Sequence, residues 1–184
     1  MNALNILIVA GTANSASPCA RLAGAMTENL AGRGALTTRI SLGDYELPLF
    51  DGEIIPVPIA QKMTKLFGAH QGVVLVNPQF SGTISPMLAN ALNWISAIDG
   101  KLFSRLAFGL VACAPGASGG SESLSHMRDM LVSTGGNVIT PQLGVCTDEK
   151  LFDVDERLIN SQYQAGMRDL SSHLMEQASL FSRG

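Results

Sequence analysis

Charged residues are scarce in this chain, and no stretch of it carries charge of a single sign. Asp, Glu, Lys and Arg make up 15% of the 184 residues, whereas hydrophobic residues make up 46%, and this balance excludes a disordered chain. Twelve Lys and Arg against fifteen Asp and Glu give a net charge of -3, so the chain lacks the basic face that nucleic acid requires. We therefore expect one compact domain over residues 1–184, with no nucleic-acid partner.

Long apolar runs and paired cysteines are also lacking. The longest apolar runs, residues 4–10 and 106–114, are much shorter than the roughly 18 residues of a membrane-spanning helix, so no membrane partner is expected. The N-terminal residues carry no basic segment and read as a first strand, not as a signal peptide. Cys19, Cys113 and Cys146 form no CxxC pair, which argues against a disulfide framework or a zinc site. A reducing, cytoplasmic location follows as the expectation.

Aliphatic runs alternate with helical patterns five times along the chain. Strands are expected at residues 4–10, 36–42, 72–77, 105–113 and 137–143. Helices are expected from Pro18, with Ser17 as N-cap, to the stop at Gly32, and over residues 59–69, 86–98, 121–134 and about 155–180. The proline-rich residues 43–58 are interpreted as an ordered surface loop. This alternation predicts an α/β fold: a doubly wound, three-layer sandwich around a five-stranded parallel sheet.

Three loops of this predicted sheet are candidates for a ligand site. In a five-stranded sheet of order 2-1-3-4-5, ligands bind beyond the carboxyl ends of the strands, where the order reverses between strands one and three. The loops that follow strands one, three and four cover residues 11–17, 77–85 and 114–120. They are the stretches richest in Gly, Ser, Thr, Asn and Pro beside a helix start, so sequence and topology indicate the same place.

The first loop has the composition of a phosphate-binding turn. It offers the hydroxyls of Thr12, Ser15 and Ser17, the amide of Asn14, and the free N–H groups of a helix N-terminus. It matches neither G-x-G-x-x-G nor G-x-x-x-x-G-K-[ST], so a lone terminal phosphate suits it better than a dinucleotide or a triphosphate. Ordinary helix capping without a ligand is the alternative.

The second and third loops are long enough to carry a flat ring. Gln79 to Thr83 lie where a ring system can rest across the strand ends, and the glycines of the third loop allow close backbone approach beside a helix whose positive end favours negative charge. A flexible connector is the alternative for the third loop. None of the three loops contains His, Asp, Glu or Lys, so acid–base catalysis from them is not expected.

Together these loops resemble those of the NADPH-dependent FMN reductase family. In that family a Pro-Glu-Tyr-Asn-Gly-Ser segment leads into a Leu-Lys-Asn-Ala-Ile-Asp-Trp helix, and here the segment from Pro78 to Thr83 precedes the helix segment from Leu88 to Trp94 at the same spacing. The first loop is similar to the family's Gly-Ser-x-Arg-x-x-Ser motif, and the third resembles a family turn only in composition. The likeness runs from the first strand to the fourth helix.

The resemblance implies a flavodoxin-like fold that binds FMN and takes hydride from NADPH or NADH. It further implies a small electron acceptor, such as a quinone, a free flavin, an azo dye or a metal oxyanion, and a homodimer or homotetramer. The implied cofactor-binding residues are Gly11, Thr12, Asn14, Ser15, Ser17, Cys19, Pro78, Gln79, Phe80, Ser81, Gly82, Thr83, Pro115, Gly116, Ser118, Gly119 and Gly120.

Two departures from the family motif concern the phosphate. Asn14 stands where the family usually has Arg, and Cys19 stands where it often has Asn. Charge-assisted hydrogen bonds contribute about 1.5–3 kcal/mol, so the neutral side chain at position 14 predicts phosphate binding weaker by roughly 10- to 100-fold. Arg21, one turn into the helix, either compensates in part or is a solvated surface residue.

Two other functions fit parts of the sequence. Residues 116–120 match the G-x-S-x-G motif of serine hydrolases, with Ser118 as nucleophile, His173 as base, and Asp148, Asp153 or Asp155 as acid. However, His173 falls inside a predicted helix, and Pro115 disturbs the turn that the motif requires. A non-catalytic binding protein with a vestigial phosphate loop is the other alternative. No metal site is expected, and His70 and His126 are interpreted as surface or helix-end residues and not as ligands.

Overall fold

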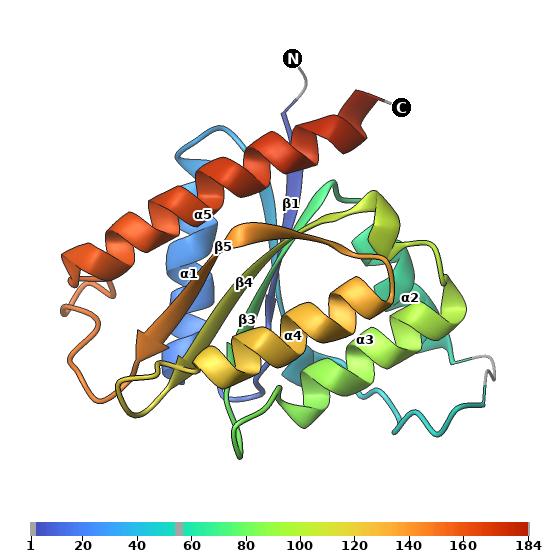
Figure 1. Ribbon diagram of the computed structural model, residues 1–184, viewed down its shortest axis with the longest axis horizontal. Helices are drawn as coiled ribbons and strands as arrows, with labels where there is room; N and C mark the ends of the chain where they lie inside the picture. The colour runs from blue at the N-terminus through green and yellow to red at the C-terminus, as the bar shows by residue number, and fades with distance from the viewer. Residues whose placement is uncertain (1–2, 54–56, 184) are drawn as a thin grey trace.

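The computed structural model, which describes residues 3–53 and 57–183, contains one parallel sheet with helices on both faces (Figure 1). Five strands lie in the order β2-β1-β3-β4-β5, which confirms the predicted α/β fold and strand order. The strands are β1 (Asn5–Ala10), β2 (Leu36–Ser41), β3 (Gly72–Pro78), β4 (Ala107–Ala114) and β5 (Asn137–Cys146). The helices are α1 (Pro18–Ala31), α2 (Pro58–Gly68), α3 (Pro86–Ile98), α4 (Ser121–Ser133) and α5 (Ser161–Ser179). Single 3-10 turns cover Leu42–Asp44, Phe103–Arg105 and Leu180–Arg183.

The sheet separates two apolar clusters. Because successive side chains of a strand point to opposite faces, Ile6 and Ile8 of β1 pack with α1 and α5, whereas Leu7 and Val9 pack with α2, α3 and α4. Figure 1 shows these two helical layers on either side of the sheet. Strands β3 and β4 lie in the middle, and nearly every residue in them is buried. The central strands are therefore rigid, and the loops at their carboxyl ends start from fixed positions.

Serine caps and prolines fix the starts of the two helices that border the candidate site. The Ser17 hydroxyl accepts a hydrogen bond from the Ala20 N–H at 3.2 Å, and Ser85 accepts one from Leu88 at 3.3 Å. In each case proline follows at the first helical position, where its missing N–H has no cost. The predicted start of α1 is confirmed.

Two elements at the C-terminal side differ from the sequence prediction. Helix α5 begins at residue 161 and not near 155, because the Asn160 side chain caps it by accepting from the N–H groups of Gln162 and Tyr163. Strand β5 continues to residue 146 past Pro141, since its pairing with β4 shifts register there. Such a bulge on an edge strand accommodates a proline that cannot donate to the ladder.

The loop after β2 is ordered, as predicted, over its described part, and residues 54–56 of the predicted range lie outside the described residues. Its Pro48 carbonyl accepts from Asn90 Nδ2 at 2.9 Å and from Trp94 Nε1 at 2.8 Å. The Phe50 ring packs edge-on against Trp94 with centroids 5.0 Å apart. Asn90 and Trp94, two residues that carried the family resemblance, therefore fasten this loop to α3. In the described ranges no helix has the length and apolar character needed to cross a membrane.

Candidate functional site

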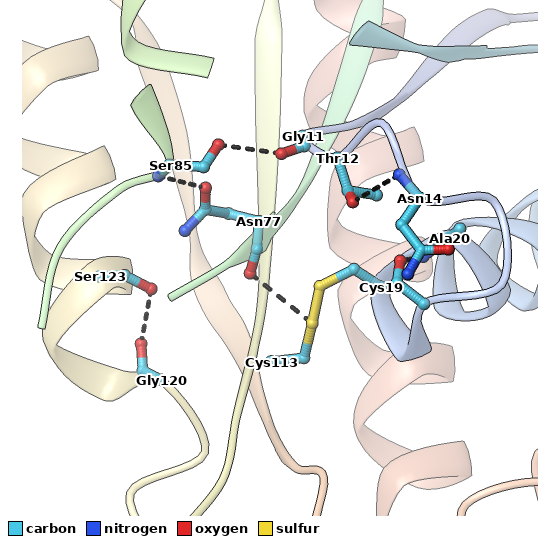
Figure 2. Close-up of a disulfide and its surroundings, with 11 residues drawn as sticks. Gly11, Thr12, Asn14, Cys19, Ala20, Asn77, Ser85, Cys113, Gly120 and Ser123 are labelled. Atoms are coloured by element: carbon cyan, nitrogen blue, oxygen red, sulfur yellow. Dashed lines mark hydrogen bonds between the residues drawn. A yellow bond between two sulfur atoms is a disulfide. The ribbon is translucent and has the colours of Figure 1, made fainter. Parts of the chain in front are cut away.

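The three loops singled out in the sequence meet at the carboxyl edge of the sheet. Parallel neighbours place β1, β3 and β4 side by side, and hydrogen bonds continue the ladder into the loops. The Gly11 N–H donates to the Val76 carbonyl at 2.8 Å, and the Gln79 N–H donates to the Cys113 carbonyl at 3.0 Å. The loops after β1, β3 and β4 therefore form one continuous edge, called the rim below. Part of it is drawn in Figure 2.

The first loop folds into a turn built around Asn14. The Asn14 N–H donates to the Thr12 hydroxyl at 3.1 Å. The Asn14 side-chain oxygen accepts from the Ala16 N–H at 3.0 Å, and the Asn14 carbonyl accepts from the Ser17 N–H at 3.1 Å. The Ser41 hydroxyl on β2 holds the Thr12 carbonyl from the other side at 2.7 Å. Asn14 thus shapes the turn through its own side chain, which is a frequent role of asparagine in loops.

The start of α1 leaves donors available for an anion. Cys19 is the second helical residue, so its N–H has no partner within the helix. The N–H and hydroxyl of Ser15 are exposed on the turn just before it. Serine hydroxyls, free N–H groups and the positive end of the helix are the donor set that binds phosphate in other helix-start sites. The arrangement fits a terminal phosphate and supplies only neutral donors.

Of the basic residues near the turn, Arg21 on α1 is bound elsewhere, whereas Arg39 on β2 lies beside the turn. Arg21 forms an ion pair with Glu156, and its guanidinium carbon lies 4.2 Å from the centre of the Phe152 ring. It is therefore tied to the segment between β5 and α5 and does not replace an arginine at position 14. Arg39 on β2 lines a hollow of about 280 Å³ together with Ser15.

The second loop is a tight hairpin that presents an aromatic ring. Phe80 and Thr83 exchange backbone hydrogen bonds at 3.2 and 3.0 Å. Between them Ser81 and Gly82 have φ of 50° and 72°, and positive φ at both central residues is typical of a type I′ turn. The Phe80 side chain is 54% exposed, which leaves an apolar face at the rim for a flat ring.

A buried polar network joins the second loop to the first (Figure 2). Asn77 accepts a hydrogen bond from the Ser85 N–H at 2.9 Å, and the Ser85 hydroxyl donates to the Gly11 carbonyl at 2.9 Å. All three groups lie beneath the loops, away from solvent. The Asn77 Nδ2 is buried and has no hydrogen-bond partner within the described residues. The network fixes the spacing between the first loop and the hairpin.

Helix α4 holds the second loop from the opposite side. Gln79 accepts from the Ser123 N–H at 3.1 Å, and His126 Nδ1 lies 2.8 Å from the Thr83 hydroxyl. The exposed Glu122 carboxylate has a lowered pKa, chiefly because it accepts from its own backbone N–H and then from Gln79. Sequence reasoning missed these contacts. The helical spacing of residues 122, 123 and 126 is visible in the sequence, but the way α4 packs against the hairpin is not.

Several backbone N–H groups of the third loop already have hydrogen-bond acceptors. Gly116 donates to the Asp148 carboxylate at 2.7 Å, Gly119 donates to the Gly116 carbonyl at 3.1 Å, and Ser121 donates to the Ser118 carbonyl at 3.0 Å. Residues 115–118 are exposed at the rim, whereas Gly119 and Gly120 are buried. At Gly119 an added Cβ would lie 2.9 Å from the Val145 backbone nitrogen, so this glycine is required by close packing against β5.

A disulfide joins Cys19 of α1 to Cys113 of β4 (Figure 2), with Cα atoms 6.2 Å apart. The prediction that the cysteines argue against disulfides is therefore wrong for this pair, and Cys146 is the free cysteine. The two residues are 94 positions apart in the sequence. Spacing could not indicate their contact because it arises only when α1 packs across the sheet and reaches the end of β4.

The geometry excludes the serine hydrolase interpretation. Ser118 follows the carboxyl end of β4, whereas His173 lines a hollow with Asn137 and Val138 at the opposite end of the sheet. Asp148 lies near the loop but binds the Gly116 N–H. The other two aspartates considered lie in a surface turn before α5. No acid, base and serine are therefore aligned among these residues.

Fold and site together define an α/β protein with a serine-rich turn at a helix start and an exposed aromatic ring at its switch point. The model of the NADPH-dependent FMN reductase family matches residues 4–150, and the chain belongs to this family. The NADPH azoreductase of Bacillus sp. (strain OY1-2) is 32% identical over 100 residues, which cover 53% of this chain and 54% of that protein. The chain thus matches about half the length of this curated relative.

Solved structures share the fold. The flavoenzyme NAD(P)H:(acceptor) oxidoreductase FerB from Paracoccus denitrificans superposes with a TM-score of 0.83 at 12% identity, covering 97% of this chain and 98% of that one. An NADH:FMN oxidoreductase, EMOB, in its apo form gives a TM-score of 0.72 at 13% identity, covering 93% and 88%. At these identities the likeness shows the flavodoxin-like fold alone.

Proposed function

We propose that this protein is an FMN-dependent NAD(P)H oxidoreductase that passes electrons from a nicotinamide to a small acceptor. FMN and NADPH are the cofactor and electron donor in the family's description. The observation that carries the proposal is the joining of a phosphate-type turn and an exposed aromatic ring on one rim. The Asn77 and Ser85 hydrogen bonds hold these two features at a fixed spacing.

The first loop would hold the phosphate. Ser15 and Ser17 lie just before the positive end of α1, and the Cys19 N–H belongs to its first turn, where a dianion is stabilised without a charged side chain. The second loop would hold the flavin ring. Phe80 offers an apolar face at the rim, and the neighbouring hairpin amides can position the polar edge of the ring. The donor set and the exposed aromatic therefore fit FMN.

Bound FMN supplies hydride transfer, which leaves the protein to bind, orient and tune. The three loops contain no acidic, basic or histidine side chains. This agrees with a protein that binds and orients the cofactor and leaves the chemistry to it. His126, which faces Thr83 from α4, positions the hairpin. A non-catalytic binding protein remains the competing function, and a protein that takes up no FMN would support it.

The third loop would stabilise negative charge on the reduced ring. The N–H groups of Ala117 and Ser118 lie on the exposed part of this loop, and the N-terminus of α4 follows it. The Glu122 carboxylate in the first turn of α4 opposes that effect. A bound FMN whose reduction potential equals that of free FMN would contradict this role.

The proposal also covers the electron acceptor, the oligomeric state and the cellular location of the protein. Quinones, free flavins, azo dyes and metal oxyanions share small size and two-electron or stepwise reduction, and an open rim can admit any of them. Trp94 is 2% exposed because the loop after β2 covers it, so a homodimer or homotetramer would use other residues, such as Met87 on α3. Light scattering tests the assembly, and cell fractionation tests the cytoplasmic location.

The experiment is uptake followed by turnover. The purified protein is incubated with excess FMN, desalted, and examined by visible absorption, and NADH or NADPH oxidation is then followed with a quinone or azo dye. We expect a flavin spectrum that is bleached by the nicotinamide and restored by the acceptor. A colourless protein that neither retains FMN nor quenches its fluorescence would overturn the proposal.

A further inference from the structure

We propose that Cys19 and Cys113 are a reversible dithiol–disulfide couple that controls FMN binding by fixing or releasing the first turn of α1. The inference rests on the proposed function, since the first turn of α1 is the phosphate end of the proposed site. Cys19 is the second residue of α1, and Cys113 is the next-to-last residue of β4. Their Cα separation of 6.2 Å lies within the range of ordinary disulfides.

The disulfide connects a helix end to a fully buried strand of the sheet. Every residue of β4 is buried, and the Cys113 carbonyl also receives the Gln79 N–H that starts the second loop. The disulfide therefore ties the phosphate turn to the strand that positions the ring loop. No other covalent link joins these two parts of the proposed site among the described residues.

Both redox states find suitable surroundings in the fold. The Cys113 sulfur lies 3.8 Å from the Asn77 carbonyl oxygen, which can accept a hydrogen bond from the thiol once the disulfide opens. Cys19 lies in the first turn of α1, where the helix dipole stabilises a thiolate. Each sulfur therefore has a favourable environment in the reduced state, as a couple that closes and reopens requires.

Reduction proceeds through a mixed disulfide on Cys113. Both cysteines are buried, with 5% of Cys113 and 1% of Cys19 exposed, and the thiolate of a small dithiol attacks the Cys113 sulfur first because Cys19, at the helix N-terminus, is the better leaving thiolate. The sulfur–sulfur bond breaks and Cys19 leaves as a thiolate, which the helix N-terminus favours. In the mixed disulfide one sulfur of the reductant is bonded to Cys113. The second thiol of the reductant attacks that reductant sulfur, and Cys113 is released. The reductant ends as a cyclic disulfide, and the two cysteines take up two protons.

Closure needs a two-electron oxidant that reaches a buried site. Hydrogen peroxide is small enough: the two thiols give up two electrons and two protons, the sulfur–sulfur bond forms, and two waters leave. The closed state holds the Cys19 N–H and the Ser17 cap in place before ligand arrives, and such preorganisation strengthens binding. The open state leaves the first turn held by the Ser17 cap and by the packing of α1 in the core, while the Ser41 and Ser85 hydrogen bonds still hold the preceding loop.

The test compares the full chain after peroxide and after dithiothreitol. Denaturing alkylation followed by intact-mass analysis should show one modified cysteine, Cys146, in the first sample and three in the second. FMN binding, followed by quenching of flavin fluorescence, should be about three- to tenfold weaker in the reduced protein, the size expected when one or two groups must be ordered on binding.

Two variants separate the couple from other causes. Cys113→Ser should bind FMN like the reduced protein under both conditions, and Cys146→Ser should follow the wild type under both. Three alkylated cysteines after peroxide would overturn the couple, and equal FMN affinity in both states would overturn its control of binding. If neither state binds FMN, the proposed function fails and the control of binding fails with it, while the alkylation count still decides whether the couple exists.

Discussion

At the residue scale, the first loop, which we propose holds the phosphate, depends on short side chains that each make a backbone contact. Ser17 caps α1, and Asn14 closes the turn before it. Both contacts are local, which is why Ser17 and Pro18 identified the helix start from sequence. The use of Asn14 as a turn former could not be predicted from its type alone, because asparagine serves equally well as a ligand or as a turn residue.

Substitution of Ser17 separates capping from phosphate binding. Ser17→Ala should lower the free energy of unfolding by about 1 kcal/mol, because the Ala20 N–H loses its acceptor. Ser17→Asp should retain stability, since aspartate caps as well as serine, yet weaken FMN binding by at least about tenfold through repulsion of the phosphate. Urea unfolding and fluorescence titration measure the two effects. Wild-type FMN affinity in Ser17→Asp would place the phosphate elsewhere.

A positive charge at position 14 should strengthen the site. Asn14→Arg adds a charge-assisted contact but removes the hydrogen bond between the Asn14 side chain and Ala16. We expect FMN to bind up to about tenfold more tightly at low salt, with a smaller gain at high salt because screening weakens the new contact. Fluorescence titration at two ionic strengths measures this. An unchanged or weaker affinity at both would contradict the assignment of this turn to phosphate.

At the element scale, the hairpin after β3 is held from both sides. Ser85 ties it to the first loop, and α4 ties it through Ser123 and His126. The sequence predicted the hairpin residues and the α3 cap, because both depend on neighbours in the chain. It did not predict the contacts with α4 or the late start of α5, since those depend on how elements pack or on which of several possible caps is used.

Loss of the Ser85 hydroxyl should destabilise the edge of the sheet. Ser85→Ala removes the donor to the buried Gly11 carbonyl and the cap of α3, so we expect the unfolding free energy to fall by about 1–3 kcal/mol. Ser125→Ala is the matched control: its exposed hydroxyl donates to the Ser121 carbonyl within the same helix, and a change below about 0.5 kcal/mol is expected. Equal effects in chemical denaturation would show that the Ser85 network does not hold the loops.

The Glu122 carboxyl, at the start of α4, should make the stability of the folded protein depend on pH. Its own backbone N–H and then Gln79 hold the pKa of the carboxyl below its ordinary value of 4.5. The ionised form is therefore favoured in the folded protein. Its contribution to the free energy of unfolding is complete above pH 4.5 and is lost as the pH falls through the folded-state pKa. The melting temperature of wild type should exceed that of Glu122→Gln at neutral pH and converge with it in acid. A difference that grows on acidification would contradict this.

At the scale of the whole molecule, strand order brings the site together. Alternation of strands and helices was sufficient to predict the fold and the edge at which the loops meet, because parallel strands need crossovers and share one carboxyl edge. The disulfide between Cys19 and Cys113 is the clearest feature that sequence could not supply. Its two residues lie 94 positions apart, and only the packing of α1 across β1, β3 and β4 places them in contact.

The most direct test of the central claim is a crystal structure of the protein soaked with FMN. The account predicts the phosphate at the start of α1, within hydrogen-bond distance of Ser15, Ser17 and the Cys19 N–H, and the flavin ring against Phe80. Density for FMN at another place on the molecule, or none at saturating concentration, would contradict the account.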